Sequence, residues 1–125
     1  MTALVDTSVL IDVLRGVPAA HQLLQAEMRV ERLRASEITR LEVLAGMRES
    51  ERPATEALLA TLAWSPVDAR VAQRAGDLGR LHLPGNRGID AADLAIAATA
   101  ELLDARLLTL NIRHFPMFAG LARPY

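Results

Sequence analysis

The sequence predicts an α/β fold in three layers, with a central parallel β-sheet flanked by helices. Short apolar runs that suit buried strands alternate with longer segments of helical periodicity, which is the pattern of parallel sheets. The chain has 125 residues, of which 51% are apolar. That is enough to build one hydrophobic core, so we expect a single domain over residues 1–125.

The first half is expected to contain two strands and four helices. Gly16 ends the first helix, and Pro18 suits the first turn of the second. In the third helix, Leu41, Leu44 and Ala45 form one apolar stripe. The expected strands span residues 2–5 and 32–36, and the expected helices span 7–15, 18–29, 38–50 and 53–62.

The second half continues this alternation. Pro66 cannot donate to a central ladder, so the short strand around it belongs at an edge. Asp68 is a suitable N-cap for the next helix, and the Ala-rich helix that follows is apolar nearly all round, which predicts a central, buried position. The expected elements are strands at 64–67, 107–110 and 121–125, helices at 68–81 and 91–103, a loop at 83–88 and a turn at 115–118.

The composition excludes several classes of protein. No cysteine is present, which rules out disulfides, thiolate catalysis and cysteine zinc sites. All 14 basic residues are arginines, and the absence of lysine rules out P-loop NTPases, pyridoxal-phosphate enzymes and Schiff-base aldolases. The net charge is only −1, but six of the arginines lie between residues 29 and 52. They are either a basic rim that contacts phosphate or simply solvated helix faces.

The start of the sequence does not resemble a signal peptide. Asp6 and Asp12 interrupt its apolar stretch, and no basic segment precedes it. No apolar run reaches the ~18 residues that a membrane span needs. We therefore expect a cytoplasmic protein without a membrane partner.

Four polar side chains are expected at one rim of the sheet, and three of them are acids. Asp6 and Asn111 follow expected strands, whereas Glu42 and Asp93 lie near the starts of helices. The carboxyl ends of parallel strands and the N-termini of the helices gather at the same rim. Acids in apolar surroundings need a compensating charge, and Mg²⁺ prefers oxygen ligands. The pattern therefore favours a site for a hard divalent cation.

Each acid also has a purely structural interpretation, which the sequence leaves open. Asp6 is a candidate cap for the first helix. Thr39 and Glu42 have the spacing of a capping box. Asp90 suits an N-cap, with Asp93 three residues later where the helix dipole favours negative charge.

Four segments, taken together, carry a family resemblance: DTSVLID at 6–12, SEITRLEVLAG at 36–46, DLAIAATA at 93–100 and LTLNIRHF at 108–115. In this order and spacing they resemble the motifs of the PIN-domain ribonucleases, specifically the VapC toxins of prokaryotic toxin–antitoxin pairs. The resemblance spans nearly the whole chain.

The resemblance implies a PIN-like fold with a strand order of roughly 3-2-1-4-5. It implies an endoribonuclease that depends on Mg²⁺ or Mn²⁺, cuts tRNA, rRNA or mRNA, and restrains translation and growth until its antitoxin binds. It also implies a homodimer, a VapB-like antitoxin, and a larger assembly on operator DNA formed through the antitoxin.

The expected site residues follow from the matching motifs. Asp6, Glu42 and Asp93 form the expected three-acid metal site. Asp6 and Asp93 would bind the metal directly or through water, and Glu42 would also orient or deprotonate the attacking water. Asn111 would complete the catalytic set. Supporting roles at the site are expected for Thr7, Ser8, Asp90 and His114, and RNA contacts for Arg113 and Arg40.

One departure from the family pattern concerns the fourth position. Family members commonly carry an acid near the position of Asn111 or three residues later, where this chain has His114. A neutral amide supplies no charge, so one metal ion is favoured over two. His114 either contacts phosphate or metal, or is a solvated side chain. The alternative function is a catalytically degenerate PIN domain that binds RNA or a partner without cutting.

Overall fold

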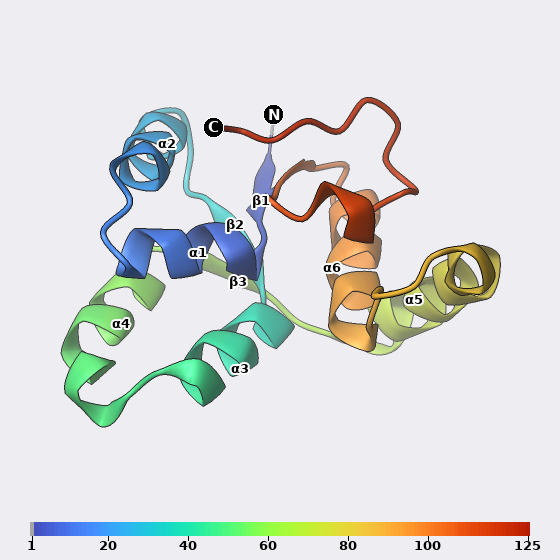
Figure 1. The fold of residues 1–125 in the computed structure, drawn as a ribbon, viewed down its shortest axis with the longest axis horizontal. Coiled ribbons are helices and arrows are strands. Elements are labelled where there is room, and N and C mark those ends of the chain that lie inside the picture. The colour runs from blue at the N-terminus through green and yellow to red at the C-terminus, as the bar shows by residue number, and fades with distance from the viewer. Residues whose placement is uncertain (1) are drawn as a thin grey trace.

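The central sheet of the computed structural model, which describes residues 2–125, has four parallel strands in the order β3-β2-β1-β4. The strands are β1 (Ala3–Val5), β2 (Arg34–Ser36), β3 (Ala63–Ser65) and β4 (Arg106–Leu108). Helices cover both faces of the sheet (Figure 1). The predicted three-layer α/β fold is therefore confirmed, with the Pro66 segment next to an edge strand as expected.

Four helices form the layer on one face of the sheet: α1 (Thr7–Leu14), α2 (Pro18–Met28), α3 (Glu37–Gly46) and α4 (Arg52–Leu59). A short 3-10 turn, η1 (Glu49–Glu51), leads into α4. Ala3 and Val5 of β1 pack against Val9 and Leu10 of α1 in this layer's hydrophobic core. Burying this apolar surface holds α1, and hence the residues at its start, against the end of β1.

The opposite face carries α5 (Ala69–His82) and α6 (Ala91–Leu102), which Figure 1 shows on the other side of the strands. Leu4 faces this second core, as the two-residue period of a strand requires. Every residue of α6 from Asp93 to Ala100 is buried, so the predicted central helix is confirmed. The two helices approach closely at Gly79, where an added Cβ would lie 3.1 Å from a Leu94 methyl group.

Two predictions for individual elements are wrong. The helix α3 ends at Gly46, and its inward face carries Thr39 and Val43, whereas Leu41 is 60% exposed and Ala45 is also exposed. The helix begins directly after β2, and its rotation leaves only Leu44 of the expected apolar stripe packed against the core, where that side chain is partly buried.

The second wrong prediction is a fifth strand at the end of the sequence. Residues 121–125 form no strand, and within residues 2–125 the sheet ends at β4. Gly120 turns the chain with a φ of 74°. The segment then runs to α1, where the Tyr125 hydroxyl donates a hydrogen bond to Asp12. The other two differences are short 3-10 turns, η2 (Leu83–Gly85) in the expected loop and η3 (Ile112–His114) just before the expected turn.

None of the helices in the described part of the chain is long and apolar enough to cross a membrane.

Candidate active site

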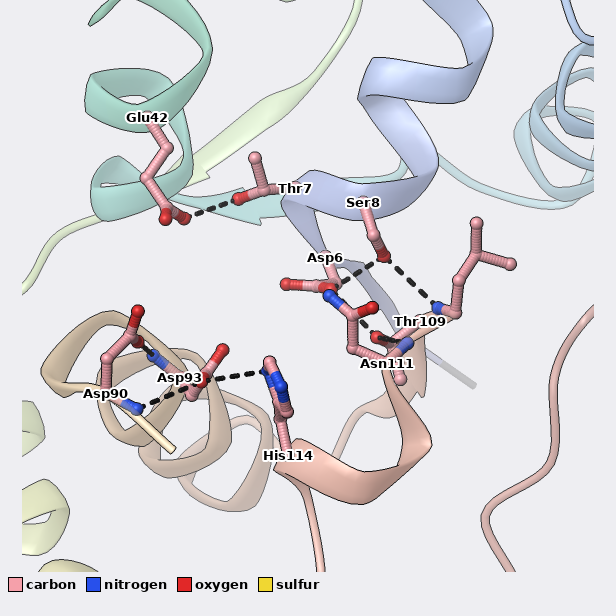
Figure 2. A network of polar contacts seen from close by, with 10 residues as sticks. Asp6, Thr7, Ser8, Glu42, Asp90, Asp93, Thr109, Asn111 and His114 are labelled. Atoms are coloured by element: carbon pink, nitrogen blue, oxygen red, sulfur yellow. Dashed lines mark hydrogen bonds and ion pairs between the residues drawn. The ribbon is translucent and has the colours of Figure 1, made fainter. Parts of the chain in front are cut away.

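The four side chains predicted to meet at one rim of the sheet line a single cavity of about 350 Å³. Asp6 follows β1, Glu42 belongs to α3, Asp93 lies in the first turn of α6 and Asn111 follows β4 (Figure 2). Four different elements thus contribute one polar side chain each to the same space. The remaining lining residues are Thr7, Ser8, Ile11, Asp12, Arg15 and Leu110.

Asp6 is held by hydroxyl groups rather than used as a helix cap. Its side chain is only 3% exposed, and Oδ2 accepts hydrogen bonds from Ser8 Oγ and Thr109 Oγ1, both at 2.8 Å. No capping bond from the Asp6 side chain to α1 is present. Both hydroxyl bonds end on one oxygen, which leaves the second oxygen to the cavity.

Ser8 joins the start of α1 to the segment after β4. Its hydroxyl donates to Asp6 and accepts from the backbone N–H of Leu110 at 3.1 Å. Thr109 supports the same corner, because its Oγ1 also accepts from the Asn111 N–H at 3.0 Å. Of the two hydroxyl residues at the start of α1 for which supporting roles were expected, Ser8 bonds to Asp6 and Thr7 does not.

Thr7 instead holds Glu42. Its hydroxyl lies 2.8 Å from Glu42 Oε1 and 3.0 Å from the hydroxyl of Thr39, which is fully buried. The capping-box interpretation of Glu42 is wrong, because the N-cap of α3 is Ser36. Burial raises the pKa of Glu42, the Thr7 hydrogen bond partly opposes this, and the negative charge of Asp6 adds to the rise.

Asp93 combines a structural role with a place in the cavity. Asp90 Oδ1 accepts from the Asp93 N–H at 2.8 Å, and Asp93 Oδ2 accepts from the Asp90 N–H at 3.1 Å, which is a complete capping box. His114 Nδ1 lies 3.1 Å from the same Oδ2. Burial raises the pKa of Asp93 to about 6, with a further contribution from the Asp90 charge, although the hydrogen bond from the Asp90 N–H and the attraction of His114 act in the opposite direction.

Asn111 directly precedes η3, and His114 is the last residue of that turn. Asn111 is exposed and makes no capping bond to that turn, so its amide faces the cavity without a structural task of its own. His114 is half-buried beside Asp93 (Figure 2). The interpretation of His114 as a merely solvated side chain is therefore wrong, because it supports a predicted metal ligand.

The donor set fits a hard divalent cation that keeps part of its water shell. Within residues 2–125, no three Asp, Glu or His side chains are arranged to enclose an ion, so the predicted three-acid cluster is not closed. Mg²⁺, however, usually retains several waters and is bound through one or two carboxylates. Asp6 and Asp93 each place one carboxylate in the lining of the cavity, which meets that need.

Four residues of the site were missed in the sequence. Asp12 and Arg15 line the cavity, and the spacing Ser8-Asp12-Arg15 places all three on one face of a helix, which is a usable signal. Tyr125 donates to Asp12 Oδ2 at 2.8 Å, and burial together with this bond raises the Tyr125 pKa to about 12. The role of Thr109 gave no signal in the sequence, because a threonine at the end of a strand is common.

The two arginines predicted to contact RNA differ in their surroundings. Arg40 forms an ion pair with Glu37 at 2.5 Å and lies over the Trp64 ring at 4.0 Å from its centroid, so its charge is engaged within the fold. Arg113 is exposed and lines a neighbouring cavity of about 320 Å³ that also includes Asn111. The structure therefore favours Arg113 over Arg40 as an RNA contact.

Comparison with known proteins identifies the class to which this fold and site belong. The family model of the PIN domain matches residues 3–121. The chain therefore belongs to the PIN-domain family.

Within that family the chain groups with the VapC proteins. It is 49% identical over 124 residues to "Ribonuclease VapC19" of Mycobacterium tuberculosis, which covers 98% of both chains. It is also 41% identical over 122 residues to "Ribonuclease VapC10" of the same organism, covering 98% of this chain and 92% of the relative. The resemblance read from the four motifs is confirmed.

Comparison with solved structures gives the same fold. A chain of a toxin–antitoxin complex from Klebsiella pneumoniae superposes with a TM-score of 0.83 at 29% identity, covering 99% of this chain and 98% of that one. A chain of DNA-bound VapBC from Salmonella typhimurium gives a TM-score of 0.82 over 98% and 96% of the two chains. At 18% identity the second likeness supports the fold alone.

Proposed function

We propose that this chain is the toxin of a toxin–antitoxin pair and acts as a metal-dependent endoribonuclease. It hydrolyses phosphodiester bonds of cellular RNA (tRNA, rRNA or mRNA) in the cytoplasm, and so restrains translation and growth until its antitoxin binds. The observation that carries the proposal is the cavity that gathers Asp6, Glu42 and Asp93, in a chain 49% identical to a ribonuclease over almost its whole length. We also assign the whole sequence to one PIN domain.

Asp6 and Asp93 are the residues that would hold Mg²⁺, with Mn²⁺ able to substitute. When bound, the cation supplies charge neutralisation at the scissile phosphate and activation of water. The Ser8 and Thr109 hydroxyls fix the Asp6 carboxylate, and the Asp90 N–H together with His114 fixes that of Asp93. Both ligands are therefore oriented before any substrate arrives.

Glu42 is the candidate general base. It is partly buried, its pKa is raised, and the Thr7 hydroxyl holds one of its oxygens at 2.8 Å. A carboxylate with a raised pKa is a better proton acceptor near neutral pH than an ordinary one. We infer that Glu42 takes the proton of the attacking water, while the Asn111 amide helps to orient that water. In-line attack would leave 5′-phosphate and 3′-hydroxyl ends.

The partner is inferred to be a VapB-type antitoxin. A groove of about 490 Å³ next to the site is lined by Leu14, Met47 and Arg48 and shares Arg15 and Glu42 with the catalytic surroundings. A bound antitoxin segment in this groove would therefore reach the acids directly. The homodimer, and the larger assembly on operator DNA through the antitoxin, remain predictions.

The test is cleavage of RNA by the purified protein. Cleavage should require Mg²⁺ or Mn²⁺, should stop with EDTA, and should fall at least about 100-fold in Asp6→Asn and Asp93→Asn. Asp68→Asn is the matched control, because Asp68 caps α5 outside the cavity. Full activity in either site variant contradicts the proposal.

The degenerate alternative is distinguished by metal binding. An intact site should raise the melting temperature of the wild type as Mn²⁺ is added, by the linkage between binding and folding. A protein that binds RNA without cleaving it, and whose melting temperature does not respond to either cation, is the degenerate PIN domain.

A further inference from the structure

A second, basic cavity adjoins the acidic one. Its volume is about 320 Å³, and it shares Leu110 and Asn111 with the cavity that contains the acids. Its three ionisable lining side chains, Arg113, His114 and Arg123, are all basic. An acidic cavity and a basic cavity thus adjoin each other at Leu110 and Asn111.

The two arginines of this basic cavity have no counter-charge among the described residues, whereas His114 lies 3.1 Å from Asp93 Oδ2. Within residues 2–125, neither Arg113 nor Arg123 has a carboxylate within ion-pair distance, and both side chains are exposed. Five other arginines differ in this respect. Ion pairs with Asp or Glu are formed by Arg40, Arg52, Arg74, Arg80 and Arg106.

The last residues of the sequence place Arg123 in this position. Two residues further on, the Tyr125 hydroxyl donates to Asp12 Oδ2 at 2.8 Å, and the Tyr125 side chain packs against the core beside α1. Asp12 itself lines the acidic cavity. The segment that carries Arg123 is therefore fixed to the wall of the acidic cavity by a side-chain bond rather than by pairing with the sheet.

We propose that the basic cavity is a subsite for a phosphate of the RNA strand next to the scissile phosphate, with Arg113 and Arg123 as its ligands and Tyr125 as a positioning residue. This rests on the proposed ribonuclease function. A guanidinium group binds phosphate oxygens bidentately, and a polyanion that crosses an acidic site gains most from cations immediately beyond it. An RNA strand offers a second phosphate at that point, whereas a mononucleotide or a single phosphate group does not.

The experiment compares Arg123→Gln with Arg29→Gln. Arg29 is also exposed, forms no ion pair within residues 2–125, and lines neither cavity. Binding of a single-stranded RNA oligonucleotide is measured by fluorescence anisotropy in EDTA over a salt series, and cleavage kinetics are measured with Mn²⁺. Loss of one phosphate contact should reduce the slope of log K against log salt by about 0.7.

For Arg123→Gln we expect Kd and KM to rise about 3- to 10-fold at moderate salt, with a smaller change in kcat and the reduced salt slope. Arg123→Lys should restore part of the binding, because it keeps the charge but not the bidentate geometry. A dinucleotide substrate, which is too short to occupy both cavities, should be cleaved at the same rate by the wild type and by Arg123→Gln.

Tyr125→Phe tests the positioning role separately. It keeps the packed ring and removes only the bond to Asp12. It should weaken RNA binding in the same direction as Arg123→Gln, and the double variant should be no weaker than Arg123→Gln alone. Additive effects would overturn the positioning role.

The outcomes separate this inference from the function on which it rests. If the wild type does not cleave RNA with either metal, the proposed function fails and the subsite fails with it. If the wild type cleaves RNA but Arg123→Gln matches Arg29→Gln in Kd, KM and salt slope, only the subsite is overturned. The same holds if Arg123→Gln weakens antitoxin binding while leaving RNA binding unchanged.

Discussion

Replacing Asp93 by asparagine is expected to stabilise the metal-free protein while it abolishes cleavage. Asp93 is buried, with 8% of the residue exposed, at the start of an apolar helix. Burial, together with the neighbouring Asp90 charge, raises its pKa to about 6, so at pH 7.5 it is ionised in surroundings that disfavour the charge. A residue kept for metal binding is expected to lower stability when the metal is absent.

The size of the effect follows from the pKa. The rise from 3.8 to about 6 corresponds to about 3 kcal/mol of unfolding free energy, at about 1.4 kcal/mol for each pH unit. Asparagine keeps an oxygen that can accept the Asp90 N–H but loses the attraction to His114. We therefore expect a net gain of about 1–2 kcal/mol, or about 4–8 °C in melting temperature for a domain of this size.

The gain in stability of Asp93→Asn over the wild type should increase as the pH rises. An aspartate in the unfolded chain has a pKa of about 3.9, below the value of about 6 in the folded protein. Between these values the folded state holds a proton that the unfolded state has released, so stability falls as the pH rises. The difference between Asp93→Asn and the wild type should be small near pH 4, grow up to about pH 6, and stay constant above it.

The assay is urea unfolding of both proteins in EDTA at several pH values between 4 and 8. Asp68→Asn is the control, because Asp68 Oδ1 accepts from the Val71 N–H at 3.0 Å in an ordinary N-cap and asparagine caps helices equally well. Mn²⁺ should then stabilise the wild type but not Asp93→Asn. A variant less stable than the wild type at pH 7.5, or a difference that does not vary with pH, refutes the reasoning.

Two further substitutions test the neighbourhood of the site. Thr109→Val removes the hydroxyl that donates to Asp6 Oδ2 and accepts from the Asn111 N–H. It should lower the free energy of unfolding in urea by about 1–3 kcal/mol and should lower kcat more than KM. Unchanged cleavage rates would show that Asp6 does not need this support. Ser65→Ala removes a buried Oγ that has no hydrogen-bond partner in the described part of the chain, and it should raise the unfolding free energy by about 1 kcal/mol; a loss of stability would reveal a partner for that hydroxyl.

The fold was largely predictable because its signals are local. Alternating apolar runs and helices indicate a parallel sheet, and the all-apolar run after Asp93 indicates the buried helix α6. The inward face of α3 was not predictable in this way. Thr39 is fully buried there because its hydroxyl meets that of Thr7, and a polar residue satisfied by a distant partner looks like a surface residue in the sequence.

The site was predictable in position but not in its connections. The ends of strands and the starts of helices placed Asp6, Glu42, Asp93 and Asn111 at one rim, and the cavity gathers them there. What orients them depends on contacts between residues far apart in the sequence. A single sequence carries no information on such pairs, so the hydrogen bond from Thr109 to Asp6 could not be predicted from it.

These long-range contacts share one helix. The start of α1 is bonded to the segment after β4 through Ser8 and Leu110, and Asp12 of the same helix is bonded to Tyr125. The pairs are 102 and 113 residues apart, so they close nearly the whole chain into loops. Closing such loops costs conformational entropy, which only the packed sheet and helices can offset. The orientation of the carboxylates is therefore a property of the complete fold, and RNA cleavage should disappear in step with global unfolding rather than with the loss of any single element.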